Sequence, residues 1–334
     1  MEFGEVAVAG AAGAVLAHSL AAGGVRLRKG HVLAPEDVAR LAAAGVSQVT
    51  VARPGPDDMA EDDAAAAVGG ALVAGEPGLR AGAAATGRVN LYARDAGLLA
   101  VDAAAVTRLN LADPSITLAT LPPLARVVPG KMVATVKIIP YAVPRARVDD
   151  AVSAAGGALR LHPVVLRSAA LIQTETPGAP PHLAQKGRES VAARLSALGI
   201  TLAHDAVVPH EVPALAAALD ARDEPLILVL TGSATSDVAD VAPRALERAG
   251  GHVARFGIPV DPGNLVFLGQ RGNSAVIGLP GSIRSPVPSG ADWILERVVC
   301  GMTPGPEEIA ALGVGGLLKE GPERPHPREG RRPR

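Results

Sequence analysis

One fully apolar run, from Leu226 to Leu230, constrains the fold of this chain more than any other feature. It ends in Thr231-Gly232, a hydroxyl-rich loop and two aspartates, and a helical pattern follows. A short run that is apolar on both faces is typical of a parallel strand covered by helices on both sides. Ligands of open α/β sheets bind at the carboxyl ends of such strands. The pattern therefore predicts an α/β fold with a phosphate-accepting site directly after Leu230.

The second half of the chain repeats this alternation of strand and helix with short loops. We predict strands ending near 175, 208, 230 and 278, and helices over 186–198, 210–220, 241–249 and 292–299. Regular alternation of this kind indicates a three-layer domain with a mostly parallel sheet. We place this α/β domain at 160–303.

The first half has shorter elements, and we predict a smaller α+β N-terminal module over 1–150. Pro35-Glu36-Asp37 opens a helix, because proline fits the first turn and acids favour its positive end. Short β-like segments separated by prolines dominate 75–145, so we expect this part to be rich in β-structure. Pro, Arg, Glu and Gly accumulate towards the end of the chain, and 304–334 is predicted to be a disordered basic tail.

Composition excludes several classes of function. The chain has 334 residues, 48% of them hydrophobic, which suffices for a large core without disulfides. Aromatic residues are only 2% and the net charge is −1, which argues against nucleic acid as a partner. The single cysteine, Cys300, excludes a disulfide within the chain and a cysteine-rich metal site. The Ala- and Gly-rich segment 6–25 follows Glu2 and Glu5 rather than basic residues, so we predict a cytoplasmic protein without a signal peptide or membrane span.

The first candidate site is the loop after the apolar run, which contains Thr231, Gly232, Ser233 and Thr235. Small residues at a strand end let backbone N–H groups approach an anion, and hydroxyls add hydrogen bonds. Asp237 and Asp240 follow at the start of the next helix. One of them is a helix N-cap in the structural interpretation. In the functional interpretation Asp240 binds a ligand hydroxyl or a Mg²⁺ ion that bridges phosphates.

The second candidate loop contains Pro280, Gly281, Ser282, Arg284 and Ser285, and it also follows a predicted strand. An arginine in this position is suited to bidentate pairing with a phosphate, although a turn with a surface arginine is an equally good interpretation.

Other polar residues also lie at predicted strand ends. Thr174 and Glu175 end the first strand of the domain, and we include both among the candidate ligand-binding residues, although a structural role is the simpler interpretation of Glu175. We interpret His210 as a structural residue at the start of a helix.

These motifs together resemble a known family. The Thr231-Gly232 loop, Asp237, Asp240-Val241 and Leu279-Pro280-Gly281 are similar to motifs of the molybdopterin-binding domain superfamily of molybdenum-cofactor biosynthesis. That superfamily includes molybdopterin adenylyltransferases, molybdotransferases and gephyrin. The order of the N-terminal segments, including Thr86-Gly87-Arg88-Val89-Asn90, resembles bacterial stand-alone molybdopterin-binding proteins.

The resemblance implies a function and roles for residues. Molybdopterin, or its nucleotide form, would be the ligand or substrate, with Mg²⁺ as a possible second cofactor. The Thr231-Gly232 loop would hold the pterin phosphate, and Pro280-Gly281-Ser282 would form the opposite wall. Asp240, with Asp237, would contact the pterin or assist a transferase reaction. The resemblance also implies a homo-oligomer and other cofactor-maturation enzymes as partners.

The chain departs from the family pattern at four places. Ser233 and Thr235 stand where glycines are usual, His210 replaces an aspartate of the adenylyltransferases, and Ser282-Ile283 replaces an Asn-Pro of the molybdotransferases. Binding spreads over many contacts and tolerates such changes better than turnover does. We therefore predict binding and delivery of molybdopterin first, with nucleotidyl or molybdate transfer second. The alternatives are a Mg²⁺-dependent nucleotide-diphosphate hydrolase or pyridine-nucleotide enzyme, and a non-catalytic scaffold.

Overall fold

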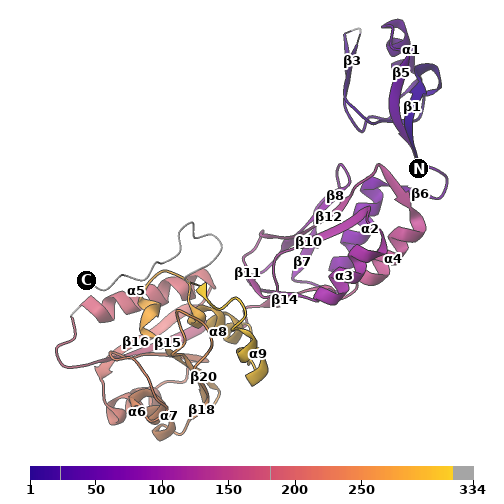
Figure 1. The fold of residues 1–334 in the computed structure, drawn as a ribbon. Helices are drawn as coiled ribbons and strands as arrows, with labels where there is room; N and C mark the ends of the chain where they lie inside the picture. Colours follow the sequence, from indigo (N-terminus) through magenta and orange to yellow (C-terminus); the bar gives the residue numbers. More distant parts are fainter. Residues whose placement is uncertain (23, 181, 319–334) are drawn as a thin grey trace, which may run out of the picture. The chain divides into compact units, whose positions relative to one another are not determined.

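The computed structural model describes residues 1–22, 24–180 and 182–318. The chain divides into two compact units, Met1–His162 and Pro163–Arg334, which are described separately below (Figure 1).

Unit 1 begins with a small β-structure around a central strand. Strand β5 (Gln48–Arg53) pairs antiparallel with β1 (Glu2–Ala7) and with β2 (Val15–Leu16). Strands β3 (Leu20–Ala22) and β4 (Val25–Leu27) form a hairpin, and helix α1 (Pro35–Ala43) begins at the predicted proline. Its core contains Leu16, Leu33, Leu41 and Val51.

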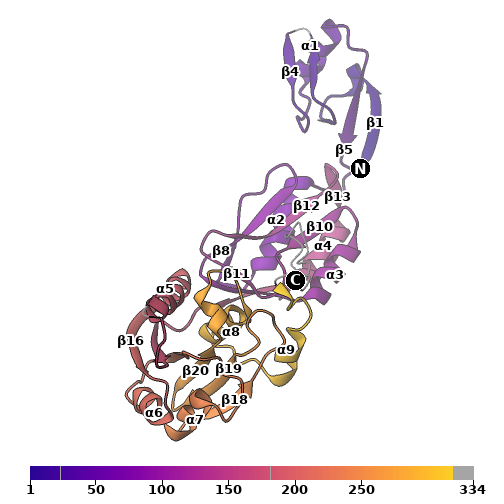
Figure 2. The ribbon, with the colours of Figure 1, turned by 60° about the vertical axis from the view of Figure 1, so that its left-hand side comes forward.

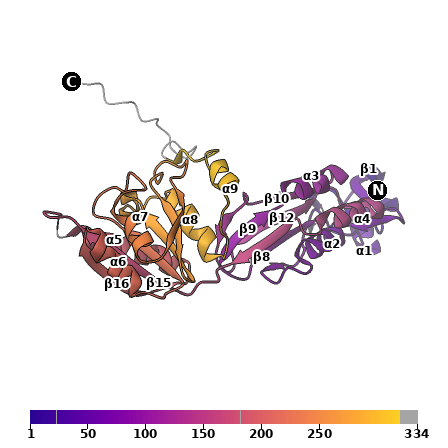
Figure 3. The same cartoon turned by 90° about the horizontal axis from the view of Figure 1, so that it is seen from below.

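The rest of unit 1 packs three helices on one side of a four-stranded sheet (Figure 3). The sheet has the order β10 (Ile116–Thr120), β12 (Met132–Ile138), β8 (Arg88–Ala93) and β7 (Leu79–Ala81). Three further strands form a smaller sheet in the order β11 (Ala125–Val127), β9 (Gly97–Val101) and β14 (Leu159–Pro163), and β6 (Asp58–Ala60) pairs with β13 (Ala142–Pro144).

The helices of this part of unit 1 are α2 (Glu61–Val73), α3 (Ala103–Ala112) and α4 (Arg145–Ala155). Helix α3 lies where the sequence predicted mainly β-structure, and Asp102 caps it by accepting hydrogen bonds from the N–H groups of Ala104 and Ala105.

Unit 2 is built on a six-stranded, mostly parallel sheet, which confirms the predicted α/β class. The strand order is β16 (Thr201–Pro209), β15 (Ser168–Glu175), β17 (Leu226–Leu230), β20 (Ser274–Leu279), β19 (Phe267–Arg271) and β18 (His252–Phe256). The first four strands run parallel, and β19 runs antiparallel to both of its neighbours. All residues of β17 are buried, as its apolar sequence predicts.

Helices cover both faces of this sheet (Figure 1). Helices α5 (His182–Ala197) and α8 (Gly290–Val299) lie on one side, and α6 (Val212–Asp220) and α7 (Val241–Arg248) lie on the other. Ile172, Val229, Leu246 and Phe267 belong to the core beneath α6 and α7.

The end of the chain is in part helical. Helix α9 (Pro306–Ala311) lies inside the segment that the sequence predicted to be a disordered tail. Residues 319–334 of that tail lie outside the described residues. Across the described ranges, no helix combines the length and the apolar character that a bilayer crossing needs.

Candidate functional site

The three central parallel strands of unit 2 bring their carboxyl ends together. In their register, Gln173 of β15 lies beside Leu230 of β17, and Leu230 lies beside Leu279 of β20. The next residues along the chain are Thr174, Thr231 and Pro280. The loops predicted to bind a ligand therefore leave one edge of one sheet, although they are far apart in the sequence.

The first contact at this edge joins Thr174 to Gly232. The backbone N–H of Gly232 donates to the hydroxyl of Thr174 over 3.0 Å. A Cβ atom on Gly232 would lie 2.7 Å from the carbonyl oxygen of Thr174 and 3.2 Å from the nitrogen of Thr176. Only glycine allows the two loops to approach this closely. The sequence singled out Gly232 for approach to a ligand, and the structure shows approach to another loop.

The two threonine hydroxyls of the Thr231 loop are used within the loop itself. Thr231 and Thr235 are both buried. The Thr231 hydroxyl donates to the carbonyl of Ser233 over 2.6 Å, and the two threonine hydroxyls lie 3.2 Å apart. Among the described residues, the backbone N–H groups of Ser233, Ala234 and Thr235 have no hydrogen-bond partner. The loop thus offers backbone donors to an anion, while its threonine side chains hold its shape.

Arg284 connects the second loop to the first. It lies in the 3₁₀ helix η2 (Gly281–Arg284), and its Nη2 donates to the carbonyl of Thr231 over 3.0 Å. Its Nε and the hydroxyl of Ser282 are buried, and neither has a partner in the described part of the chain. Burial lowers the pKa of the Arg284 guanidinium, but an arginine stays cationic at neutral pH. A desolvated cation with a spare donor favours an anionic ligand.

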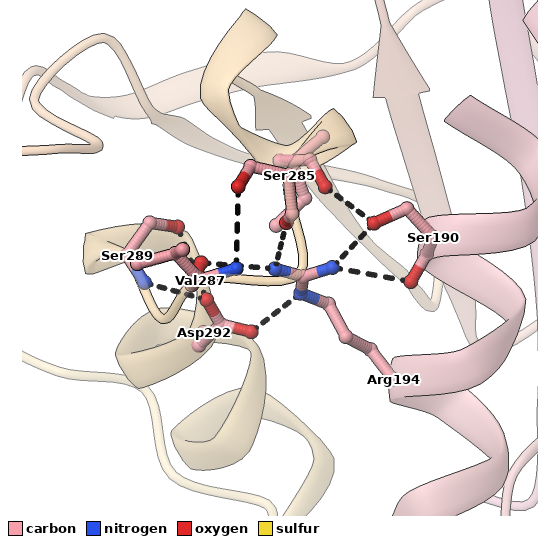
Figure 4. A network of polar contacts seen from close by, with 7 residues as sticks. Ser190, Arg194, Ser285, Val287, Ser289 and Asp292 are labelled. Atoms are coloured by element: carbon pink, nitrogen blue, oxygen red, sulfur yellow. Dashed lines mark hydrogen bonds and ion pairs between the residues drawn. The ribbon is translucent and has the colours of Figure 1, made fainter. Parts of the chain in front are cut away.

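Helix α5 holds the second loop in place through Arg194, as Figure 4 shows. The guanidinium pairs with Asp292 over 2.6 Å and donates to the carbonyl of Ser285 over 2.8 Å. Ser190 donates to the carbonyl of Ile283 over 2.7 Å. The contact with Arg194 thus holds the backbone of Ser285, which the sequence predicted to be a ligand-binding residue. Arg194 and Ser190 were not predicted from the sequence, because no motif marks them and their partners are remote in sequence.

The two aspartates support the backbone of the turn before α7. Asp240 is the N-cap of α7, and its carboxylate accepts from the N–H groups of Val241 (2.7 Å) and Ser236 (3.2 Å). Asp237 accepts from the N–H of Ala239 over 2.7 Å. Within the described ranges neither carboxylate has a polar contact with 280–285, and no group of three or more His, Cys, Asp or Glu side chains is arranged to hold a metal. The structure thus shows the capping role of Asp240, and its ligand role stays a prediction.

Two further polar residues belong to this edge. Nδ1 of His210 lies 2.8 Å from the hydroxyl of Thr174, and His210, Glu175 and Glu211 line an open cleft of about 420 Å³. Gln173 is buried in β15, and its amide donates to the carbonyl of Ala184 while its Oε1 has no partner among the described residues. Gln173 was not predicted from the sequence, although an amide directly after the apolar run Ala169–Ile172 is a usable signal for a polar site.

Comparison with known proteins identifies the domain that contains this edge. Residues 148–297 match the family model described as a "Probable molybdopterin binding domain". This region belongs to that family. The match spans β15, β17 and β20, so all the loops of the candidate site lie within the molybdopterin-binding domain. Residues 5–53 match a second family model, described as a domain of unknown function.

Two solved structures show a limited similarity to the chain. A molybdopterin biosynthesis protein (moea protein) from Pyrococcus horikosii is 15% identical with a TM-score of 0.33, over 90% of this chain and 75% of that one. A molybdenum cofactor biosynthesis protein from Pyrococcus furiosus is 13% identical with a TM-score of 0.26, over 91% of this chain and 66% of that one. No curated protein matches the chain.

Proposed function

We propose that unit 2 binds molybdopterin, or its nucleotide form, at the carboxyl edge of its sheet, and that the protein serves the biosynthesis or delivery of the molybdenum cofactor. The family match of residues 148–297 supports this ligand. The single observation that carries the proposal is the position of Arg284. This cation joins two loops at the strand ends and keeps a buried Nε free of partners within the described chain.

The phosphate of the pterin is the group that this edge recognises. Arg284 supplies the positive charge, and the N–H groups of Ser233 to Thr235 supply neutral donors from the facing loop. Ser282 adds a buried hydroxyl from the same short helix as Arg284. Backbone donors and an arginine together make a typical phosphate-binding arrangement.

Binding is better supported than turnover. A nucleotidyl or molybdate transfer would use Mg²⁺, and we propose Asp240 as the carboxylate that would ligate that ion. Both oxygens of Asp240 already accept backbone N–H groups, so the ligand phosphates would have to supply most of the coordination. Among the described residues, no contact at this edge favours nucleotide-diphosphate hydrolysis or a scaffold role. Both stay predictions, as do the oligomeric state and cytoplasmic location.

Retention of pterin by the purified full-length chain tests this function. The chain is mixed with molybdopterin, passed through gel filtration and assayed for pterin fluorescence in the protein peak. The wild type retains pterin, and Arg284→Gln binds it about 10-fold more weakly or worse, because a hydrogen bond to a charged group contributes about 1.5–3 kcal/mol. Arg188→Gln, which removes an exposed arginine elsewhere in unit 2, is the matched control and retains pterin like the wild type. No retention by the wild type, or equal retention by Arg284→Gln, contradicts the proposal.

A further inference from the structure

Unit 2 contains a second cavity, of about 480 Å³, at the opposite end of the same strands. Pro225 precedes β17 and Ala275 begins the pairing of β20, and both line this cavity. Its other wall is formed by the end of α8 and the start of α9, which follow one another along the chain in Figure 2. Ala275 and Pro280 stand at opposite ends of β20, roughly 16 Å apart at about 3.3 Å per residue. The cavity is therefore separate from the site of Arg284. We call it the α9 groove.

The walls of the α9 groove are mostly apolar. Leu268 and Ile277 face it from the sheet, and Val298, Met302 and Ile309 contribute from the α8–α9 segment. Its polar side chains include Arg255, His252, Gln270 and Asn273. None of its lining residues, all of them in the described part of the chain, is Asp or Glu. The volume and the few polar groups on apolar walls are those of a small-molecule site.

A β-bulge brings Arg255 into the groove. Val253 pairs with Gly269 and Arg255 pairs with Leu268, so Ala254 is an extra residue in β18. Because residues opposite each other on paired strands share a face, Arg255 lies on the same face as the groove residue Leu268. The Nε of Arg255 donates to the carbonyl of Gly257 over 3.0 Å, which fixes the side chain. Within the described residues Arg255 makes no ion pair, so both of its Nη groups are available.

We propose that the α9 groove binds a small organic acid, in which one carboxylate pairs with Arg255 and an apolar body lies against Leu268 and Ile277. In the described part of the chain, no Asp or Glu lines the groove, so the fixed guanidinium of Arg255 favours a ligand that carries a negative charge. Its two Nη groups and Nε lie in one plane and match the geometry of a ligand carboxylate. The apolar walls select the rest of the molecule. The chain's own residues 319–334 are a poor occupant, because they carry six Lys and Arg against three Glu.

A pair of fluorescent probes that differ in charge tests this proposal on the full-length chain. The anionic probe is 8-anilinonaphthalene-1-sulfonate, and the neutral probe is N-phenyl-1-naphthylamine. The wild type binds one molecule of the anionic probe per chain, and decanoate displaces it. Arg255→Leu weakens binding of the anionic probe at least 10-fold and changes binding of the neutral probe less than 2-fold. Arg255→Lys gives an intermediate affinity for the anionic probe.

Further variants locate the bound probes within the α9 groove. Ala254→Trp places a large side chain in the groove and abolishes binding of both probes, whereas Arg188→Gln, at an exposed ion pair outside both sites, leaves both unchanged. Thermal unfolding of each variant shows that it is folded. The proposal is overturned if the folded wild type shows no saturable binding, if Arg255→Leu weakens both probes equally, or if Ala254→Trp has no effect. It is also overturned if a chain ending at Leu318 binds the probe more tightly, because residues 319–334 would then be the occupant.

Discussion

The hydroxyl of Thr174 accepts the backbone N–H of Gly232 over 3.0 Å, and thereby joins the end of β15 to the loop that follows β17. The same hydroxyl lies 2.8 Å from Nδ1 of His210, which follows β16. One threonine side chain thus connects the ends of three neighbouring strands. Since its hydroxyl accepts from Gly232, its own proton is available to His210.

Thr174→Val tests this connection, because valine has the shape of threonine without the hydroxyl. We expect the free energy of unfolding of unit 2 to fall by about 1–3 kcal/mol, the cost of leaving a buried polar group without a partner. Hydrogen exchange at the Gly232 amide should accelerate. Thr176→Val, in the same loop but without a side-chain hydrogen bond among the described residues, is the control and should change neither quantity. Unchanged exchange at Gly232 in Thr174→Val would contradict the role of this hydroxyl.

Gly232→Ala should separate the two loops. The added methyl group would lie 2.7 Å from the carbonyl oxygen of Thr174, closer than packing allows. We expect a loss of about 1–3 kcal/mol of stability, as for other overpacked sites, and weaker pterin retention. Gly281→Ala is the matched variant, because its Cβ would meet only Nη1 of Arg284 at an ordinary 3.5 Å. Unfolding of both variants in urea gives the comparison, and equal stabilities would show that the close approach is unimportant.

Arg194→Ala should loosen the loop that carries Arg284. The side chains of Arg194 and Asp292 are only 11% and 15% exposed, and removing one partner of such a pair costs about 3–5 kcal/mol. The carbonyl of Ser285 loses its donor on α5, and Ser190, whose hydroxyl donates to the carbonyl of Ile283, loses its hydrogen bond with Arg194, so pterin retention should also fall. Arg188→Ala removes an ion pair with Asp205 whose side chains are 49% and 37% exposed, and it should cost only about 0.2–1 kcal/mol. Thermal unfolding and pterin fluorescence check both variants, and equal effects of the two would refute the prediction.

The N-terminal β-structure should lose stability in acid through Asp37. The hydrogen bond from His31, and then the N–H of Ala34, lower the pKa of Asp37 below its ordinary value of 3.8. A carboxyl group whose pKa is lower in the folded than in the unfolded protein stabilises the folded state. This stabilisation is complete at a pH above the pKa of the unfolded state, and it disappears as the pH falls through the pKa of the folded state. We expect the midpoint temperature of thermal unfolding, measured from pH 6 to pH 2, to fall in the wild type once the pH is below about 4. In Asp37→Asn this drop should be smaller, whereas Glu36→Gln, an exposed neighbour, should keep it.

Much of the fold followed from local patterns. The buried strand over Leu226–Leu230 and the start of α1 at Pro35 were predictable because hydrophobic runs and first-turn prolines act within a few residues. Helix α3 was missed because its Ala-rich sequence has no strong apolar face, and it depends on Asp102 and on packing against α4.

The candidate site was predictable in part for a similar reason. Strand ends mark where loops begin, so Thr231, Gly232 and Arg284 were identified before the fold was known. What each side chain contacts was not predictable. The sequence left Asp240 open between a cap and a ligand residue; the structure shows both of its oxygens on backbone N–H groups, and its ligand role stays a prediction. The contact of Gly232 with Thr174 was not predicted, and the part of Gly232 in ligand binding stays a prediction.

The sequence alone determined the apolar strands, the loops between them and the molybdopterin-binding domain at residues 148–297, because these depend on residue order over short spans and on motifs. Only the tertiary structure decided that Arg194 supports the Arg284 loop and that Arg255 lies in an apolar groove. Arg194 and Asp292 are 98 positions apart, and Arg255 reaches its groove through a bulge in the pairing of two strands. Such contacts arise from the packing of whole elements, and no short stretch of residues encodes them.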